Sequence, residues 1–265
     1  MKKKSIRVVL LSTLILLGAQ AAAVAEKFTE RFEETYRVDA DVSIILSNTN
    51  GNVSISIWDQ DAVELVAEKQ VSSRNAETAR EAFEKLEIVV NESTGRLEIE
   101  TIHPSAMHGF FDWVFGRSIN ASVRYRLKVP RQAELTLRTV NGNVTTAGSQ
   151  GSQHLRSTNG RIEVESAARR VDAHTTNGSI RVEVRGTSEL EIELGTTNGS
   201  ITLQLPTDAR GTLEARTVNG SVKTDIPVTL QGSASRKHVR GDFNGGGGGR
   251  IVLRTTNGSI RIVEA

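Results

Sequence analysis

Basic side chains recur at one fixed position in this sequence, three residues before a repeated Asn-Gly pair. The residues found at that position are Arg138, Arg156, His174, Gly195, Arg216 and Arg254. If the repeats stack on one another, these side chains form a basic stripe that could bind an extended polyanion, such as an acidic glycan or lipid head groups. Further basic residues, four positions after their Asn, are expected to face outward beside the same turns: Arg181, Lys223 and Arg261.

The alternative to a binding stripe is structural. The basic side chains could pair across neighbouring repeats with Glu163, Glu183 and Glu193, and charges on an exposed sheet also discourage unwanted strand pairing. Both interpretations stay open on the sequence alone.

Catalytic chemistry finds little support. Asp172, Glu193 and Glu214 stand five residues before their Asn, and clustered carboxylates of this kind occur in polysaccharide-cleaving β-helices. The chain has no cysteine nucleophile, its five histidines lack metal-ligand spacing, and no Walker, Rossmann or G-x-S-x-G motif occurs. We therefore expect a protein that is not an enzyme and that needs no cofactor or metal.

The elements that position these residues come from a repeated hexapeptide. TTNGSI occurs at Thr175–Ile180, Thr196–Ile201 and Thr255–Ile260, and four variants bring the number of copies to seven. The turns are expected at Asn50-Gly51, Asn141-Gly142, Asn159-Gly160, Asn177-Gly178, Asn198-Gly199, Asn219-Gly220 and Asn257-Gly258. Most spacings are 18 or 21 residues, which is typical of a solenoid. The last spacing, 38 residues, suggests a unit that has lost its motif within the glycine-rich stretch Arg240–Arg250.

Hydrophobic residues alternate with polar ones on both sides of each Asn-Gly pair. This period of two predicts two strands per repeat, each with one buried face. Asn and Gly both tolerate positive φ, so the pair is expected to turn the chain, while inward Thr and stacked Asn side chains could form hydrogen-bonded ladders. The prediction is an all-β protein, a parallel β-solenoid (β-helix-like) with Asn-Gly turns. A meander of hairpins is the alternative, because Asn-Gly also favours hairpins.

Residues 1–25 have the pattern of a signal peptide. Lys2, Lys3, Lys4 and Arg7 precede the apolar stretch Val8–Leu17, and Ala23-Val24-Ala25 is a suitable cleavage site. We expect export to the periplasm or cell surface, with no transmembrane anchor after cleavage; an uncleaved anchor is the alternative. Without this segment, 29 basic residues face 31 acidic ones, so net charge does not support nucleic-acid binding.

Residues 26–130 are expected to hold strands, one helix and an aromatic loop, and to continue into the repeat region, 131–265. The helix is placed at Asn75–Lys85, capped by Ser72 or Ser73, and Leu86–Val90 with Arg96–Ile102 forms a hairpin. The loop contains Phe110, Phe111, Trp113 and Phe115. It could cap one end of the solenoid or contact a partner, a sugar or a membrane surface.

The serial T-x-N-G-x-[IV] units, the helix-bearing N-terminal part and YRLKVP at Tyr125–Pro130 resemble a bacterial putative-adhesin family of β-strand repeats of unknown function. Head-GIN-type adhesins are more distantly similar. The resemblance implies a β-solenoid outside the cytoplasm with an adhesive or envelope role, and it supplies no catalytic residues. We expect a non-enzymatic, exported, adhesin-like or scaffolding protein that binds an acidic glycan, an envelope surface or an envelope protein. A glycan-processing enzyme and a periplasmic partner domain in envelope-stress signalling are the alternatives.

Overall fold

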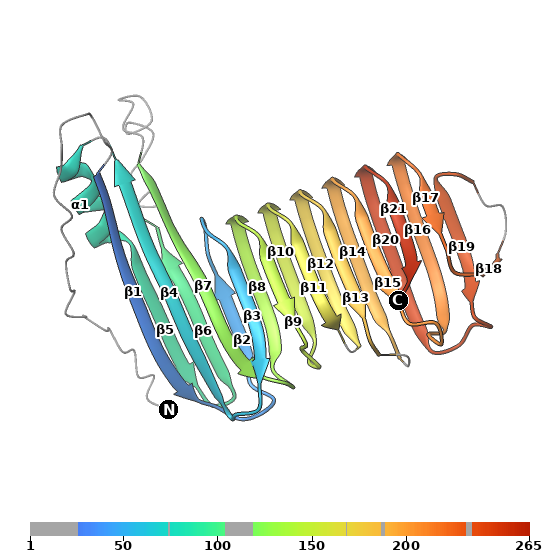
Figure 1. The fold of residues 1–265 in the computed structure, drawn as a ribbon, viewed down its shortest axis with the longest axis horizontal. Coiled ribbons are helices and arrows are strands. Elements are labelled where there is room, and N and C mark those ends of the chain that lie inside the picture. The colour runs from blue at the N-terminus through green and yellow to red at the C-terminus, as the bar shows by residue number, and fades with distance from the viewer. Residues whose placement is uncertain (1–25, 74, 104–118, 168, 187–188, 232–234) are drawn as a thin grey trace.

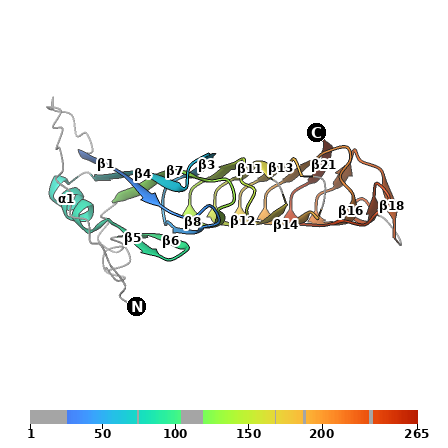
Figure 2. The ribbon, with the colours of Figure 1, turned by 90° about the horizontal axis from the view of Figure 1, so that it is seen from below.

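The computed structural model describes residues 26–73, 75–103, 119–167, 169–186, 189–231 and 235–265. The expected signal peptide and the aromatic residues Phe110, Phe111, Trp113 and Phe115 lie outside these ranges. Over the described residues, two β-sheets pack face to face as a long, flattened coil (Figures 1 and 2). The predicted all-β class with one short helix is confirmed.

The two sheets are named sheet A and sheet B. From end to end, sheet A consists of β5 (Glu87–Ser93), β6 (Arg96–Ile102), β2 (Ser43–Ser47), β8 (Glu134–Asn141), β10 (Gln153–Asn159), β12 (Arg170–Asn177), β14 (Glu191–Asn198), β20 (Gly249–Asn257), β16 (Gly211–Asn219), β19 (His238–Phe243) and β18 (Val228–Leu230). Sheet B consists of β1 (Glu26–Arg37), β4 (Ala62–Ser73), β7 (Asn120–Pro130), β3 (Val53–Trp58), β9 (Val144–Ala147), β11 (Ile162–Ala167), β13 (Ile180–Val184), β15 (Ile201–Leu205), β21 (Ile260–Glu264) and β17 (Val222–Thr224).

Each repeat forms one coil, here called a rung, with one strand in each sheet and the Asn-Gly pair at the corner between them. Neighbouring rungs pair in parallel and in register, so that Asn159 lies opposite both Asn141 and Asn177. The strands before and after one Asn-Gly pair belong to different sheets, which excludes the hairpin alternative for the repeats. Pairing is antiparallel at the two ends, among β1, β4 and β7, between β5 and β6, and among β16, β19 and β18.

The core fills the space between the sheets. Alternate residues of every repeat strand point inward, and equivalent positions stack into columns, as Leu137, Leu155, Ala173 and Leu194 do on sheet A. All four side chains are at most 1 % exposed. Burying one Leu stabilises the fold by about 1.5–3 kcal/mol, so the columns hold the stack together without disulfides.

The corner glycines are required by close stacking rather than by turn geometry. None of the motif asparagines has positive φ, and most of the corner glycines do not either. A Cβ placed on Gly178 would lie 2.0 Å from the carbonyl oxygen of Gly160 on the next rung. The expected reason for the Asn-Gly pair, tolerance of positive φ, is therefore wrong for most copies: only glycine lets consecutive corners approach this closely.

Side chains bond the corners together. The seven motif asparagines form the asparagine ladder. In the spatial order of the rungs, starting from Asn141, the Nδ2 of each Asn donates to the Oδ1 of the Asn on the rung before it, at 2.7–2.8 Å. Two residues before the motif Asn stands an inward-facing Thr. Thr175 Oγ1 donates to the carbonyl oxygen of Gly160 at 3.0 Å, and Thr196 Oγ1 donates to that of Gly178 at 3.0 Å. These bonds explain why the motif keeps Thr and Asn at fixed positions.

The spatial order of the last rungs differs from their sequence order. Strands β20 and β21 lie between the rung of β14 and β15 and the rung of β16 and β17 (Figure 1). Antiparallel β19 and β18 continue sheet A beyond β16. The 38-residue spacing thus contains this cap and its return turn, where Asn244 and Gly245–Gly248 all have positive φ. The expectation of a lost repeat unit is wrong.

At the opposite end lies helix α1 (Ala76–Lys85), which packs against β4 and β1 (Figure 2). Its N-cap is Asn75, whose side chain accepts from the backbone N–H of Thr78 at 3.0 Å; the predicted caps Ser72 and Ser73 belong to β4. The hairpin of β5 and β6 is present as predicted. No helix in the described part of the chain has the length and hydropathy needed to cross a bilayer.

Candidate functional site

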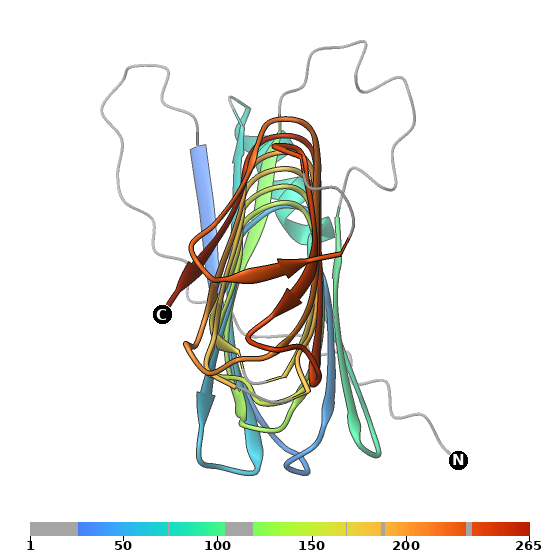
Figure 3. The same ribbon diagram turned by 90° about the vertical axis from the view of Figure 1, so that its right-hand side faces the viewer.

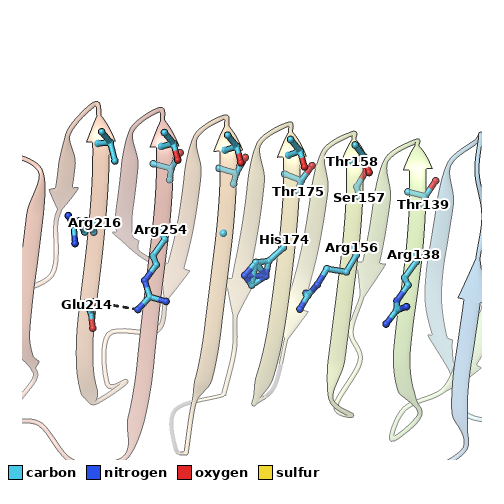
Figure 4. A pocket seen from close by; sticks show the side chains of 17 residues that line it. Arg138, Thr139, Arg156, Ser157, Thr158, His174, Thr175, Glu214, Arg216 and Arg254 are labelled. Carbon is cyan, nitrogen blue, oxygen red and sulfur yellow. Dashed lines mark ion pairs between the residues drawn. The ribbon is translucent and has the colours of Figure 1, made fainter.

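The basic residues singled out by spacing lie in one row on the outer face of sheet A. Pairing places them in the order Arg138, Arg156, His174, Gly195, Arg254 and Arg216, which we call the basic column (Figure 4). Adjacent members are about 4.8 Å apart, the spacing of neighbouring strands. The order of Arg254 and Arg216 is reversed relative to the sequence because β20 precedes β16 in the sheet.

A shallow groove of about 890 Å³ follows this column beside the Asn-Gly corners. The other side of the groove is formed by the outward-facing residues that stand just before the motif asparagines. Four of these residues are exposed threonines, called the threonine row: Thr158, Thr176, Thr197 and Thr256. Exposed Val140 and Val218 occupy the same position at the two ends of the row. The groove therefore offers hydroxyls in its middle and the apolar side chain of Val218 beside Arg216 at one end, while Val140 continues the row beyond the lining at the other.

The middle of the groove is organised by Asp172. Its carboxylate accepts two hydrogen bonds from the Arg156 guanidinium, at 2.9 and 2.6 Å, and lies 3.3 Å from His154 Nδ1 and 3.1 Å from His174 Nδ1. Burial alone would raise the pKa of Asp172, but the hydrogen bonds from Arg156 and His154 outweigh burial and hold the pKa below its ordinary value. Asp172 is thus a carboxylate at neutral pH, and Arg156 is neutralised by it.

His174 sits where the next rung has no side chain. A Cβ on Gly195 would lie 2.7 Å from His174 Cδ2, so glycine makes room for the imidazole. Burial, together with the charge of Arg156, lowers the pKa of His174 below its ordinary value. Because the ionised carboxylate of Asp172 can only accept, the neutral ring carries its proton on Nδ1, and Nε2, which lies next to Gly195, is left as an acceptor.

The ends of the groove keep their positive charge. Arg138 and Arg216 form no ion pair with any residue that the structure describes. Arg254 lies 3.7 Å from Glu193 and 3.5 Å from Glu214. Its side chain is about half exposed. Arg138 and Arg216 are separated by five rung spacings, or about 24 Å.

The expected pairing of the basic column with Glu163 and Glu183 is wrong. Among the expected acidic partners only Glu193 pairs with the basic column; Glu163 and Glu183 lie on strands of sheet B. The other partners are Asp172 and Glu214. These three carboxylates, considered above for catalysis, are instead engaged with arginine or histidine.

Arg181, Lys223 and Arg261 do not join the basic column. They align across β13, β21 and β17 on the outer face of sheet B, which is the opposite side of the flattened coil (Figure 3). Positions three before and four after the Asn flank the same corner but belong to different sheets. Over the described ranges no His, Asp and Glu side chains are grouped as metal ligands require.

Sequence reasoning missed one part of the site, the threonine row, and one residue at the end of the asparagine ladder, His103. The threonine row could have been found, because the residue between an inward Thr and the corner Asn must face outward. His103 carried no such signal: its Nε2 lies 2.8 Å from the carbonyl of Ala121 and 3.1 Å from Nδ2 of Asn50, at the end of the asparagine ladder. The expected aromatic contact residues follow His103 in the chain but lie outside the described residues.

Comparison with solved structures supports the fold. A structure titled a putative cell adhesion protein from Clostridium sporogenes ATCC 15579 has a TM-score of 0.51 at 15 % identity, over 89 % of this chain and 100 % of that chain. A putative adhesin from Bacteroides fragilis NCTC 9343 has a TM-score of 0.43 at 11 % identity, over 89 % and 97 % of the two chains. At 15 % identity the first of these similarities concerns the fold alone, and the second, with its TM-score below 0.5, adds no argument. None of the curated proteins matches the sequence.

The family resemblance noted in the sequence is confirmed by a family model. The model described as Toastrack DUF4097 matches residues 31–263, nearly all of the two sheets. The chain therefore belongs to the Toastrack DUF4097 family.

Proposed function

We propose that this protein is a non-enzymatic, extracytoplasmic binding module that holds an extended acidic glycan along the groove of sheet A. The observation that carries the proposal is the basic column, in which Arg138 and Arg216, neither of them ion-paired with a described residue, lie about 24 Å apart at the ends of one continuous groove. The pattern of residues 1–25 and the adhesin-like relatives support a location outside the cytoplasm.

The distribution of charge favours a long ligand over a small one. A small anion could contact only one end, because Asp172 neutralises the middle of the column. A chain of repeating units can place one acidic group near Arg138 and another near Arg216, and it follows the same direction as the stacked rungs. The shallow, open form of the groove also suits a polymer, since small-molecule sites are usually more enclosed.

The uncharged groups favour a sugar polymer. The threonine row supplies hydroxyls that both donate and accept. His174 Nε2 supplies an acceptor in the middle of the basic column, between Arg156 and Arg254. Sugar hydroxyls can pair with all of these groups. The engagement of Asp172, Glu193 and Glu214 with basic side chains supports binding without cleavage.

The test is binding to a linear polyuronic acid, with a neutral glucan, a monomeric uronate and vesicles of anionic phospholipid as separate arms. We expect salt-sensitive binding to the polyuronate and little competition by the monomer. The double variant Arg138→Gln, Arg216→Gln should lose at least about tenfold in affinity, because each lost charged hydrogen bond is worth roughly 1.5–3 kcal/mol.

The matched control is Arg181→Gln, Arg261→Gln, which removes the same charge from sheet B of the same coil. It should bind like the parent protein. Equal losses of affinity in the two double variants would show that only net charge matters and would reject the groove as the binding site. Binding to vesicles but not to the polyuronate would reject the glycan.

A further inference from the structure

The corner asparagines can undergo a known chemical change. At an Asn-Gly pair the backbone nitrogen of Gly can attack the side-chain Cγ of Asn, forming a five-membered succinimide as ammonia leaves. One water molecule then opens the ring to aspartate or isoaspartate. Glycine offers no side chain to hinder the attack, and asparagine is among the thermally labile residues. The reaction needs a free Gly N–H and a carboxamide that can rotate.

Six of the seven motif corners restrain the attacking nitrogen. The N–H of Gly160 donates to the carbonyl oxygen of Asn177 at 3.0 Å, and the N–H of Gly178 donates to that of Asn198 at 3.0 Å. The same bond, from each glycine to the Asn of the next rung, is made by Gly51, Gly142, Gly199 and Gly258. To react, each of these nitrogens must first give up an acceptor.

The carboxamides are restrained as well. Asn177, for example, donates through Nδ2 to Asn159 and accepts at Oδ1 from Asn198, both at 2.8 Å. Every interior member of the asparagine ladder is held in this way on both sides. Rotation of one carboxamide therefore breaks two hydrogen bonds.

Asn219 differs because its rung is the last one in the stack. Its Nδ2 donates to Asn257 Oδ1 at 2.8 Å, but its Oδ1 accepts no hydrogen bond from the described residues. The N–H of Gly220 likewise finds no acceptor among them, and both Asn219 and Gly220 are exposed. Among the described residues, the two restraints that protect the interior corners are thus both missing at this corner.

We propose that Asn219 is a spontaneous modification site, which deamidates to aspartate and isoaspartate before any other Asn-Gly pair of the folded protein. The change consumes one water and releases one ammonia. Among the side-chain bonds of the asparagine ladder, the change breaks only the one from Asn219 Nδ2 to Asn257 Oδ1, because no further motif Asn donates to Asn219. The folded stack should therefore tolerate the product at this end.

One competitor lies outside the ladder. Asn244 precedes Gly245 in the return turn of the cap. Its Nδ2, which must leave in the reaction, donates to the carbonyl oxygens of Thr207 at 3.0 Å and Ala209 at 2.8 Å. We expect these two bonds to keep Asn244 slower than Asn219.

The experiment is incubation of the purified full chain at mildly alkaline pH and elevated temperature, followed by peptide mapping with mass spectrometry and chromatographic resolution of the isoaspartyl peptides. A parallel sample in denaturant gives the unprotected rate of each pair. Interior pairs such as Asn177-Gly178 should react more than about tenfold slower folded than unfolded, because several hydrogen bonds must open first. The Asn219 peptide should react at nearly its unprotected rate.

The variant Asn219→Gln supplies the control, because glutamine keeps the carboxamide and removes the fast reaction. Circular dichroism should show the parent fold, and no other peptide should accelerate. Protection of Asn219 equal to that of the interior pairs, or earlier conversion of Asn244, would overturn the proposal. Neither result depends on whether the groove of sheet A binds a glycan.

Discussion

Substitution of a corner glycine in the middle of the stack is the sharpest test of how the rungs are held. In the variant Gly178→Ala the new Cβ would lie 2.0 Å from the Gly160 carbonyl oxygen and 2.6 Å from its carbon. Ordinary contact begins at 3.4 Å, so the two corners must separate by about 1.4 Å. Both contacted atoms belong to the backbone, so a side-chain rotation cannot relieve the overlap.

The expected loss of stability can be worked out from the bonds that cross this corner. Two backbone bonds, Gly160 N to Asn177 O and Ile162 N to Ser179 O, are 3.0 Å long. Two side-chain bonds join the same rungs: Asn177 Nδ2 to Asn159 Oδ1 at 2.8 Å and Thr175 Oγ1 to Gly160 O at 3.0 Å. A separation of this size breaks all four, and at about 1 kcal/mol net for each bond the free energy of unfolding should fall by about 4 kcal/mol.

The measurement is urea unfolding followed by circular dichroism. Gly95→Ala is the matched control, because no atom lies within 4 Å of its new Cβ although Gly95 has φ of +69°. The backbone strain there should cost about 1–2 kcal/mol. If folded Gly178→Ala loses no more stability than Gly95→Ala, close stacking is not what the corner glycines provide.

Four further predictions concern the core, the inward threonines and the dependence of stability on pH. Leu194→Ala, at a position only 1 % exposed, should lower the free energy of unfolding by about 2–5 kcal/mol in the same urea assay. Thr196→Val should cost about 1 kcal/mol by removing the bond to Gly178; an unchanged midpoint would count against this bond. Because the pKa of Asp172 is lower in the fold, its stabilisation is complete above the ordinary value of 3.8 and is lost as pH falls through the lowered pKa. Asp172→Asn should therefore flatten the acid limb of a stability–pH curve. His174, whose pKa is also lowered, should contribute a loss of stability that starts as pH falls below 6.5 and is absent in His174→Gln.

The sequence predicts well what depends on short-range alternation. The period of two on both sides of each Asn predicts the strands, the inward columns and the row of Arg138, Arg156 and His174, because residues at equal distances from a corner take equal places in register. The groove itself follows from this regularity. The choice between coils and hairpins needed the structure, because both are compatible with the same alternation.

The failures have physical causes. Rungs with identical columns are interchangeable as neighbours, so spacing cannot show that the rung of Asn257 lies beside that of Asn198. Residues before and after one corner belong to different sheets once the chain coils, so Arg181 and its equivalents could not share one stripe with the basic column. Pairing of Arg156 with Asp172 depends on contacts across rungs and side-chain conformation, which the sequence pattern does not encode.

The inserted position of β20 and β21 has a consequence for how the chain is made. Strand β16 leaves the ribosome before β20, yet its parallel neighbour in the finished sheet is β20 itself. The outer rung and its antiparallel cap must therefore wait until Gly249–Glu264 has been synthesised, so folding cannot advance strictly from the N-terminus repeat by repeat. A premature stop just before Gly249 would remove β20 and β21, which form an interior rung. It would leave β14 and β16, and likewise β15 and β17, without the strand that pairs with both of them.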